Sequence, residues 1–116
     1  MSHVVGPVDE PLLEITVGDL LNRAVADAPD RDALVSCHQD IRLTYRQLDD
    51  ASANFARGLV RLGLEPGDRI GIWSPNNVEW IITMFAASRL GLVLVNVNPA
   101  YRPIELEYAQ NKVGCK

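Results

Sequence analysis

Three polar side chains that could bind a ligand, Asn96, Asn98 and Tyr101, stand at the end of an apolar run at residues 93–97. Open parallel sheets place ligand crevices beyond the carboxyl ends of their strands. Amide and phenol groups at such a place donate and accept hydrogen bonds. Asparagine is also a turn residue, because its side chain bonds nearby backbone. The sequence leaves both interpretations of the trio open, ligand contact and turn.

No arrangement of side chains predicts catalysis within this chain. Neither GxGxxG nor GxxxxGK[ST] occurs, although backbone N–H groups reach a phosphate only where side chains are missing. His3 lies in a polar lead-in and His38 at a hairpin turn, with no nucleophile and acid spaced as a triad. Cys37 and Cys115 lack metal-ligand spacing and are predicted to be free thiols. We therefore assign no catalytic, cofactor-binding or metal-binding residue.

The amino-acid composition excludes some classes of protein. The 116 residues are 47% hydrophobic and 22% charged, as in ordinary globular proteins. Eleven Lys and Arg are scattered among fifteen acids, and the net charge of -4 argues against a nucleic-acid partner. No apolar run approaches the roughly 18 residues that span a bilayer. Residues 1–7 lack a basic stretch followed by an apolar one, which predicts no signal or transit peptide and a cytoplasmic setting.

The polar trio follows a predicted strand–helix–strand unit. Residues 69–74 form a short apolar run suited to a strand buried on both faces. Asn76 is predicted to cap the next helix, with Glu79 at the capping-box position. Gly91 ends that helix, because a residue without Cβ takes the left-handed conformation at low cost. Residues 93–97 then form a parallel strand, which completes a right-handed crossover.

Two tryptophans belong to this unit. Trp73 lies in the first strand and Trp80 on the apolar side of the helix. Large aromatic residues at such positions usually fill a core, so we predict core packing for both rather than a ligand pocket.

Flanking elements complete an α/β fold with an incomplete, mostly parallel sheet. Residues 1–15 are predicted to be an extended lead-in, and residues 16–116 one unit. Charges on the longest helix are predicted to form a solvated face. The predicted flanking elements are a helix from Thr16 to Pro29, a hairpin of 33–37 and 41–43, a helix capped by Thr44 and Gln47 with the apolar stripe Leu48, Ala51, Phe55, Leu59 and Leu62, and a helix from Pro103 to Gly114.

Three segments resemble elements of the adenylate-forming enzymes. Residues 43–48 (LTYRQL) resemble the LTYxEL element, with Gln47 where Glu is commoner. Residues 66–76 (PGDRIGIWSPN) resemble the GDRV strand with its PN turn, and residues 89–99 (RLGLVLVNVNP) resemble KxGxxxVPxNP. Tyr101 and Arg102, residues 105–109 (ELEYA) and residues 111–115 (NKVGC) look most like bacterial fatty-acyl-CoA synthetases of the medium-chain type. The whole resemblance runs from about Thr16 to Lys116.

The resemblance implies a two-step reaction. A carboxylate attacks ATP to give an acyl-adenylate and pyrophosphate, and the thiolate of coenzyme A then displaces AMP. It implies ATP, Mg²⁺ and coenzyme A for the whole enzyme, with none expected to bind this fragment. The family's phosphate loop, its adenine and ribose motifs and its catalytic lysine lie beyond Lys116. The chain therefore resembles the start of a large adenylating domain and is expected to be inactive alone and to self-associate through its exposed sheet edge.

Two other interpretations stay open. A non-catalytic α/β module, a truncated relative, would bind a nucleotide or a protein partner. An unrelated small Rossmann-like nucleotide binder is disfavoured by the missing glycine pattern.

Overall fold

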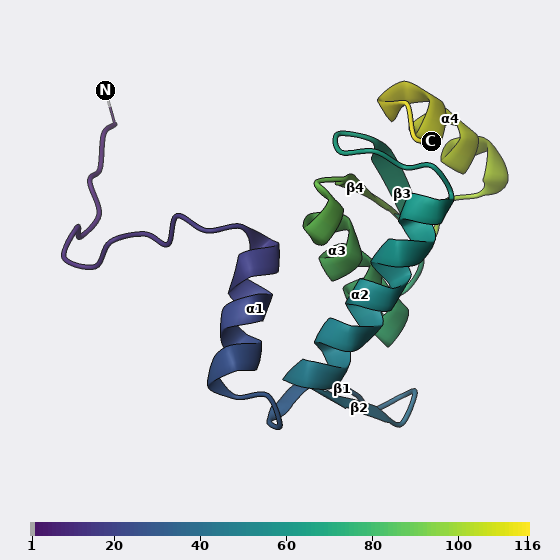
Figure 1. Ribbon diagram of the computed structural model, residues 1–116. Coiled ribbons are helices and arrows are strands. Elements are labelled where there is room, and N and C mark those ends of the chain that lie inside the picture. Colours follow the sequence, from purple (N-terminus) through teal and green to yellow (C-terminus); the bar gives the residue numbers. More distant parts are fainter. Residues whose placement is uncertain (1) are drawn as a thin grey trace.

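The computed structural model describes residues 2–116, which form a mixed α/β chain (Figure 1). This confirms the predicted fold class. The elements in order are α1 (Val17–Asp27), β1 (Asp32–Ser36), β2 (Ile41–Thr44), α2 (Tyr45–Arg61), β3 (Arg69–Trp73), α3 (Val78–Leu90), β4 (Val93–Val97) and α4 (Pro103–Val113).

Residues 2–15 precede the first helix without helix or strand and are exposed throughout. In Figure 1 this segment runs away from the body of the molecule. The Cα radius of gyration is 16.9 Å, whereas a compact chain of this length is expected near roughly 13 Å. The extended segment contributes to that excess.

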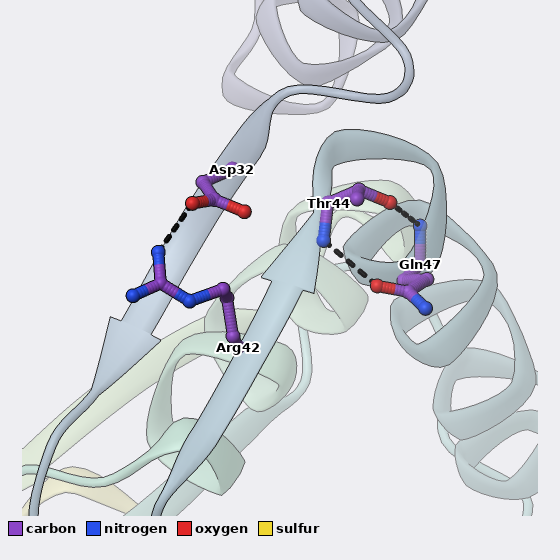
Figure 2. A network of polar contacts seen from close by, with 4 residues as sticks. All are labelled: Asp32, Arg42, Thr44 and Gln47. Atoms are coloured by element: carbon purple, nitrogen blue, oxygen red, sulfur yellow. Dashed lines mark hydrogen bonds and ion pairs between the residues drawn. The ribbon is translucent and has the colours of Figure 1, made fainter.

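Threonine caps begin two of the helices, as predicted. The N–H of Asp19 donates to Thr16 Oγ1 at 3.1 Å, which opens α1. At α2 the caps are reciprocal, because Gln47 N–H donates to Thr44 Oγ1 at 3.2 Å and Thr44 N–H donates to Gln47 Oε1 at 2.9 Å (Figure 2). Each bond satisfies a backbone donor that the helix itself leaves free.

The predicted hairpin is confirmed as the antiparallel pair β1–β2. Ser36 pairs with Ile41 and Asp32 with Thr44, with an irregularity between Asp32 and Leu34. An exposed ion pair between Asp32 and Arg42 joins the two strands (Figure 2).

The central unit is confirmed as a parallel pair. β3 and β4 are in register from Arg69 opposite Val93 to Trp73 opposite Val97, and α3 connects them. Gly91 follows α3 with φ 67°, in the left-handed region, as predicted.

The predicted cap at Asn76 is wrong by one residue. Asn77 is the cap, and its Oδ1 accepts the N–H of Trp80 at 2.9 Å. Helix α3 begins later because the side chain of Gln39, from the hairpin turn, accepts the N–H of Val78 at 2.8 Å. Glu79 does not complete a capping box. Its carboxylate instead accepts a bond from the Gln39 amide at 2.9 Å.

The buried face of α2 differs from the predicted stripe. Leu48 and Leu59 are buried as expected, but Ser52 and Ala56 are buried in place of Ala51 and Phe55. Phe55 is 42% exposed, and Leu62 is 80% exposed. Small side chains line the contact because α2 packs closely on α3, where Ala86 and Ala87 are almost fully buried.

The parallel sheet is covered well on one face only. Ile70 joins the core with residues of α2 and α3, and Leu94 packs against that core. Val93 and Trp73 are 48% and 46% exposed. The prediction that residues 69–74 form a strand buried on both faces is therefore wrong, and so is core packing of Trp73, while Trp80 is half-buried. Too few elements lie on the second face of the sheet to cover these side chains.

A turn at residues 65–68 ties the parallel sheet together. The N–H of Gly67 donates to Gly91 O, and the N–H of Val93 donates to Asp68 O, each at 2.8 Å. Asp68 Oδ2 accepts the N–H of Glu65 at 2.8 Å and forms an ion pair with Lys116 Nζ at 3.2 Å. The backbone N–H of Glu65, assisted by Lys116, lowers the pKa of Asp68 below its usual value.

The charge on Asp68 should make the fold acid-sensitive. Because its pKa is lower in the folded chain, the carboxylate stabilises the fold above about pH 4, and this stability is lost as the pH falls through the folded pKa. Asp68→Asn should therefore lower the melting temperature at pH 6 and much less at pH 3. Asp9→Asn, in the exposed lead-in, is the control. Equal effects of Asp68→Asn at both pH values would contradict this role.

Candidate functional site

The candidate ligand site is a hollow of about 720 Å³ at the carboxyl end of β4. The structure brings together all three predicted residues, Asn96, Asn98 and Tyr101, on its wall. Helix α4 supplies the opposite wall. The full lining is Val95, Asn96, Val97, Asn98, Tyr101, Ile104, Glu105, Tyr108, Ala109, Lys112 and Val113.

Local hydrogen bonds use part of the trio's bonding capacity. Asn98 Oδ1 accepts the N–H of Ala100, and Asn98 O accepts the N–H of Tyr101, both at 3.0 Å. These bonds bear out the turn interpretation for Asn98. The side chain of Tyr101 is 39% exposed. Asn96 and Tyr101 are therefore the members of the trio that we keep as candidate ligand contacts.

Helix α4 adds two groups that the sequence interpretation missed. Lys112 Nζ lies 5.5 Å from the centroid of the Tyr108 ring, a cation–π contact one helical turn apart. The available signal was the four-residue spacing of these two residues after Pro103. Glu105 is less available to a ligand, because its carboxylate already accepts the N–H of Arg102 at 2.7 Å. The hollow thus offers apolar and aromatic walls with one ammonium group.

The structure places each of the two histidines and two cysteines considered in the sequence analysis. Both cysteines are free, as predicted. His3 is exposed in the lead-in, and His38 Nδ1 lies 3.3 Å from Ser36 Oγ in the hairpin turn. Among residues 2–116, no group of three or more His, Cys, Asp or Glu side chains is placed to hold a metal ion.

A second hollow, of about 410 Å³, lies between the hairpin and the start of α3. His38 and the half-buried Trp80 both line it. Gln39 bonds two residues of its lining, because its Oε1 accepts bonds from Ser36 Oγ and from the N–H of Val78, both at 2.8 Å. The amide of Gln39 also lowers the pKa of Glu79 by bonding its carboxylate. This network positions the hairpin on α3.

One charged side chain that was predicted to lie on the solvated face of α2 forms an ion pair with a neighbouring helix instead. Asp49 forms an ion pair with Arg89 of α3, and the two side chains are 27% and 23% exposed. Arg89 Nε also donates to Oγ of the fully buried Ser52 at 3.2 Å. The prediction was wrong for Asp49, because a sequence pattern on one helix does not show where the partner helix lies.

A parallel strand pair joined by a helical crossover, with a hollow at a strand's carboxyl end, is typical of ligand-binding α/β domains. Residues 21–116 match the family described as AMP-binding enzyme, and the chain belongs to that family.

Individual relatives agree with this assignment. The chain is 44% identical over 116 residues to "Medium-chain acyl-CoA ligase ACSF2, mitochondrial" of Mus musculus, and it spans 19% of that protein. "Mycobacterium tuberculosis fatty acyl CoA synthetase" matches 87% of this chain at 30% identity and a TM-score of 0.83, with 20% of that protein covered. The N-terminal subdomain of Klebsiella oxytoca NpsA matches 86% of this chain at 27% identity and a TM-score of 0.79, with 26% of that chain covered. The chain thus spans about a fifth of the length of full-length relatives.

The cytoplasmic setting predicted from residues 1–7 is contradicted by these relatives. The mouse and human proteins, each 44% identical over the whole of this chain, are named as mitochondrial. A missing leader pattern does not decide the compartment, because targeting segments are separate pieces of sequence that are removed from the mature protein. Within the described residues, no helix is long and apolar enough to cross a membrane.

Proposed function

We propose that this chain is the opening segment of an AMP-forming acid–thiol ligase. The whole protein would activate a fatty or other carboxylic acid with ATP, giving an acyl-adenylate and pyrophosphate, and would transfer the acyl group to coenzyme A. Mg²⁺ would offset charge on the phosphates. The observation that carries the proposal is the 44% identity over the whole chain to a medium-chain acyl-CoA ligase.

The geometry supports a positioning role for this segment. Its hollow at the end of β4 offers apolar walls, amide groups and one ammonium, which bind and orient a ligand without reacting with it. The half-exposed Trp73 and the exposed Ile104 favour this proposal over a self-contained module, because such side chains are usually covered in a complete domain.

A segment exchange tests the proposed function. Residues 21–116 would replace the corresponding segment of the mouse relative, and acid-dependent pyrophosphate release and acyl-CoA formation would be measured. We expect the chimera to keep both activities. A matched chimera carrying Gly91→Val, which disrupts the end of α3, should lose most of them. A well-folded chimera that forms no thioester would count against the proposed function.

Residues 1–116 alone should not release pyrophosphate from ATP with any fatty acid. The physical reason is that the sequence contains no glycine-rich run whose backbone N–H groups could hold three phosphates, while the hollow provides one ammonium. The measurement is a coupled pyrophosphate assay with and without octanoate at equal ATP. Carboxylate-dependent turnover by the isolated chain would overturn the positioning role.

The isolated chain should also self-associate through its uncovered apolar side chains. Trp73, at the end of β3, is 46% exposed, and Ile104, which lines the hollow from α4, is 80% exposed. Light scattering after size exclusion should show oligomers, together with strong binding of a hydrophobic dye. Ile104→Glu should reduce both signals. Val60→Glu, at an exposed position on α2, is the control. A monodisperse, dye-silent monomer would favour the self-contained module.

A further inference from the structure

A groove between α2 and α3, which we call the arginine groove, combines apolar side chains with positive charge. It has a volume of about 420 Å³, and none of its residues lines the hollow at the end of β4. Its lining is apolar apart from three guanidinium groups and consists of Ala53, Ala56, Arg57, Val60, Arg61, Arg89 and Leu90. The groove therefore suits an occupant that is both apolar and negatively charged.

Two of the three arginines lack a carboxylate partner within the part of the chain that the structure describes. Arg89 forms an ion pair with Asp49, but no ion pair among residues 2–116 involves Arg57 or Arg61. Arg57 donates to the neutral side chain of Asn54, on its own helix. Arg57 and Arg61 are one helical turn apart, a spacing at which like charges destabilise a helix. Carboxylates placed beside them would relieve this repulsion.

The lead-in, residues 2–15, has the complementary composition. It carries three acids, Asp9, Glu10 and Glu14, and no Lys or Arg. Six of its large apolar side chains are exposed, among them Leu12 at 91% and Leu13 at 66%. Exposed apolar side chains that are grouped in this way mark an interaction site.

The start of α1 holds the end of the lead-in beside the arginine groove. Gly18 is buried, and a Cβ built on it would lie 3.9 Å from Arg89 Cα. Because Arg89 Nε bonds Ser52 Oγ, the groove extends along α2 from near Ser52 to Arg61. The helix rises about 13 Å over that distance. An extended run of residues 10–16 covers roughly 20 Å, so the lead-in is long enough to lie along the groove.

We propose that residues 10–15 fold back as an extended strap over the arginine groove of the same chain. Figure 1 shows the lead-in undocked, running away from the body of the molecule. The order of the charges sets the pairing: Glu14, the acid nearest to α1, lies beside Arg57, and Glu10 lies beside Arg61. Residues 2–9 take no part in the strap. The proposal concerns a surface separate from the hollow and does not depend on the proposed function.

The strap loses little freedom on docking and covers apolar surface. Pro11 fixes its own φ near −65° and favours an extended chain, which lowers the entropy lost on docking. The strap joins α1 directly, so only a short loop has to close. Leu12 and Leu13 would be covered by contact with the exposed Val60 and the half-buried Leu90. Exposed ion pairs are individually weak, so the leucines supply most of the stabilisation and the charges set the register.

Limited proteolysis of the whole chain tests the strap without any activity measurement. Thermolysin cleaves on the amino side of leucine, so cleavage of the Leu12–Leu13 bond measures the undocked fraction. Each rate is divided by that of a free peptide of residues 2–15 with the same substitutions, which removes the sequence preference of the protease. The wild-type chain should be cleaved at least about threefold more slowly than the peptide. Equal rates for chain and peptide would overturn the proposal.

Charge reversal in the groove should release the strap. Arg57→Glu with Arg61→Glu should speed the normalised cleavage at least about threefold, because two attractions become repulsions. Arg23→Glu with Arg46→Glu, an equal change of charge at exposed positions outside the groove, should leave the rate unchanged. Equal acceleration by the two double variants would contradict the assigned pairing.

A charge exchange separates release of the strap from unfolding of α2. Glu10→Arg with Glu14→Arg should release the strap to a similar extent, and these residues precede every helix and strand, so the melting temperature of the folded part should not change. Combining these changes with Arg57→Glu and Arg61→Glu should restore slow cleavage. A fourfold variant cleaved as fast as either double variant would overturn the proposal.

Dilution and lipid vesicles distinguish this strap from other occupants of the groove. Protection of the Leu12–Leu13 bond should be independent of protein concentration. Protection that disappears on dilution would assign the groove to the lead-in of a second copy and overturn the same-chain strap. Phosphatidylglycerol vesicles should bind equally with and without the two groove substitutions. Vesicle binding that depends on Arg57 and Arg61 and leaves the lead-in unprotected would assign the groove to a membrane surface instead.

Discussion

Replacing Gly91 by valine is expected to lower the free energy of unfolding by about 2 kcal/mol or more. Gly91 has φ 67°, which a β-branched residue adopts only with strain. An added Cβ would be in ordinary van der Waals contact with Pro66 Cβ at 3.5 Å, and the two methyl groups of valine extend further. Urea unfolding of the wild-type chain and the variant gives the comparison, with the slope checked for a common unfolded state.

Two matched variants separate backbone strain from other causes. Gly91→Asn should cost less than Gly91→Val, because asparagine tolerates the left-handed region. Gly58→Ala should be neutral or stabilise by up to about 1 kcal/mol, because Gly58 lies inside α2 and nothing lies within 4 Å of an added Cβ. Destabilisation by Gly58→Ala equal to that by Gly91→Val would refute the assigned helix end.

Asp49→Ala should destabilise the chain by about 2 kcal/mol, between the values for exposed and buried pairs. The reason is that Arg89 would keep its partly buried charge and only the hydroxyl of Ser52 as a partner. Asp50→Ala, at the exposed neighbouring position, should change stability by less than about 0.5 kcal/mol. Urea midpoints of the two variants provide the test.

A double-mutant cycle measures the interaction energy between Asp49 and Arg89. Asp49→Ala and Arg89→Met together should cost clearly less than the sum of the two single changes, with a coupling of roughly 1 kcal/mol. Additive effects would mean that the two charges act independently and that the contact between α2 and α3 is maintained by apolar packing alone.

Features coded by neighbouring residues were predictable from the sequence. The caps at Thr16 and Thr44, the glycine after α3 and the proline that opens α4 each depend on residues within one turn of the chain. The parallel strand pair followed from two short apolar runs separated by a helix. The grouping of the polar trio at one hollow followed from its place after β4.

The mistaken predictions depended on contacts between distant segments. The cap moved from Asn76 to Asn77 because Gln39, from the hairpin, bonds the start of α3. The buried face of α2 turned toward Ser52 and Ala56 because α3 presents alanines there. Trp73 was placed in the core on the assumption that the sheet has two covered faces, and its second face is only partly covered. Local patterns do not encode such partners.

The hairpin turn at residues 37–40 has consequences for protein engineering. Exposed hairpin tips are ordinarily good places to insert a tag or to open a chain for circular permutation. Here Gln39, at the tip, accepts the N–H of Val78 and donates to Glu79, two residues at the start of a helix 39 positions later in sequence. A longer tip would separate these groups and leave the N–H of Val78, at the start of α3, without its side-chain acceptor. Fluorescent labels and affinity tags therefore belong in residues 2–15, and the hairpin should keep its natural length.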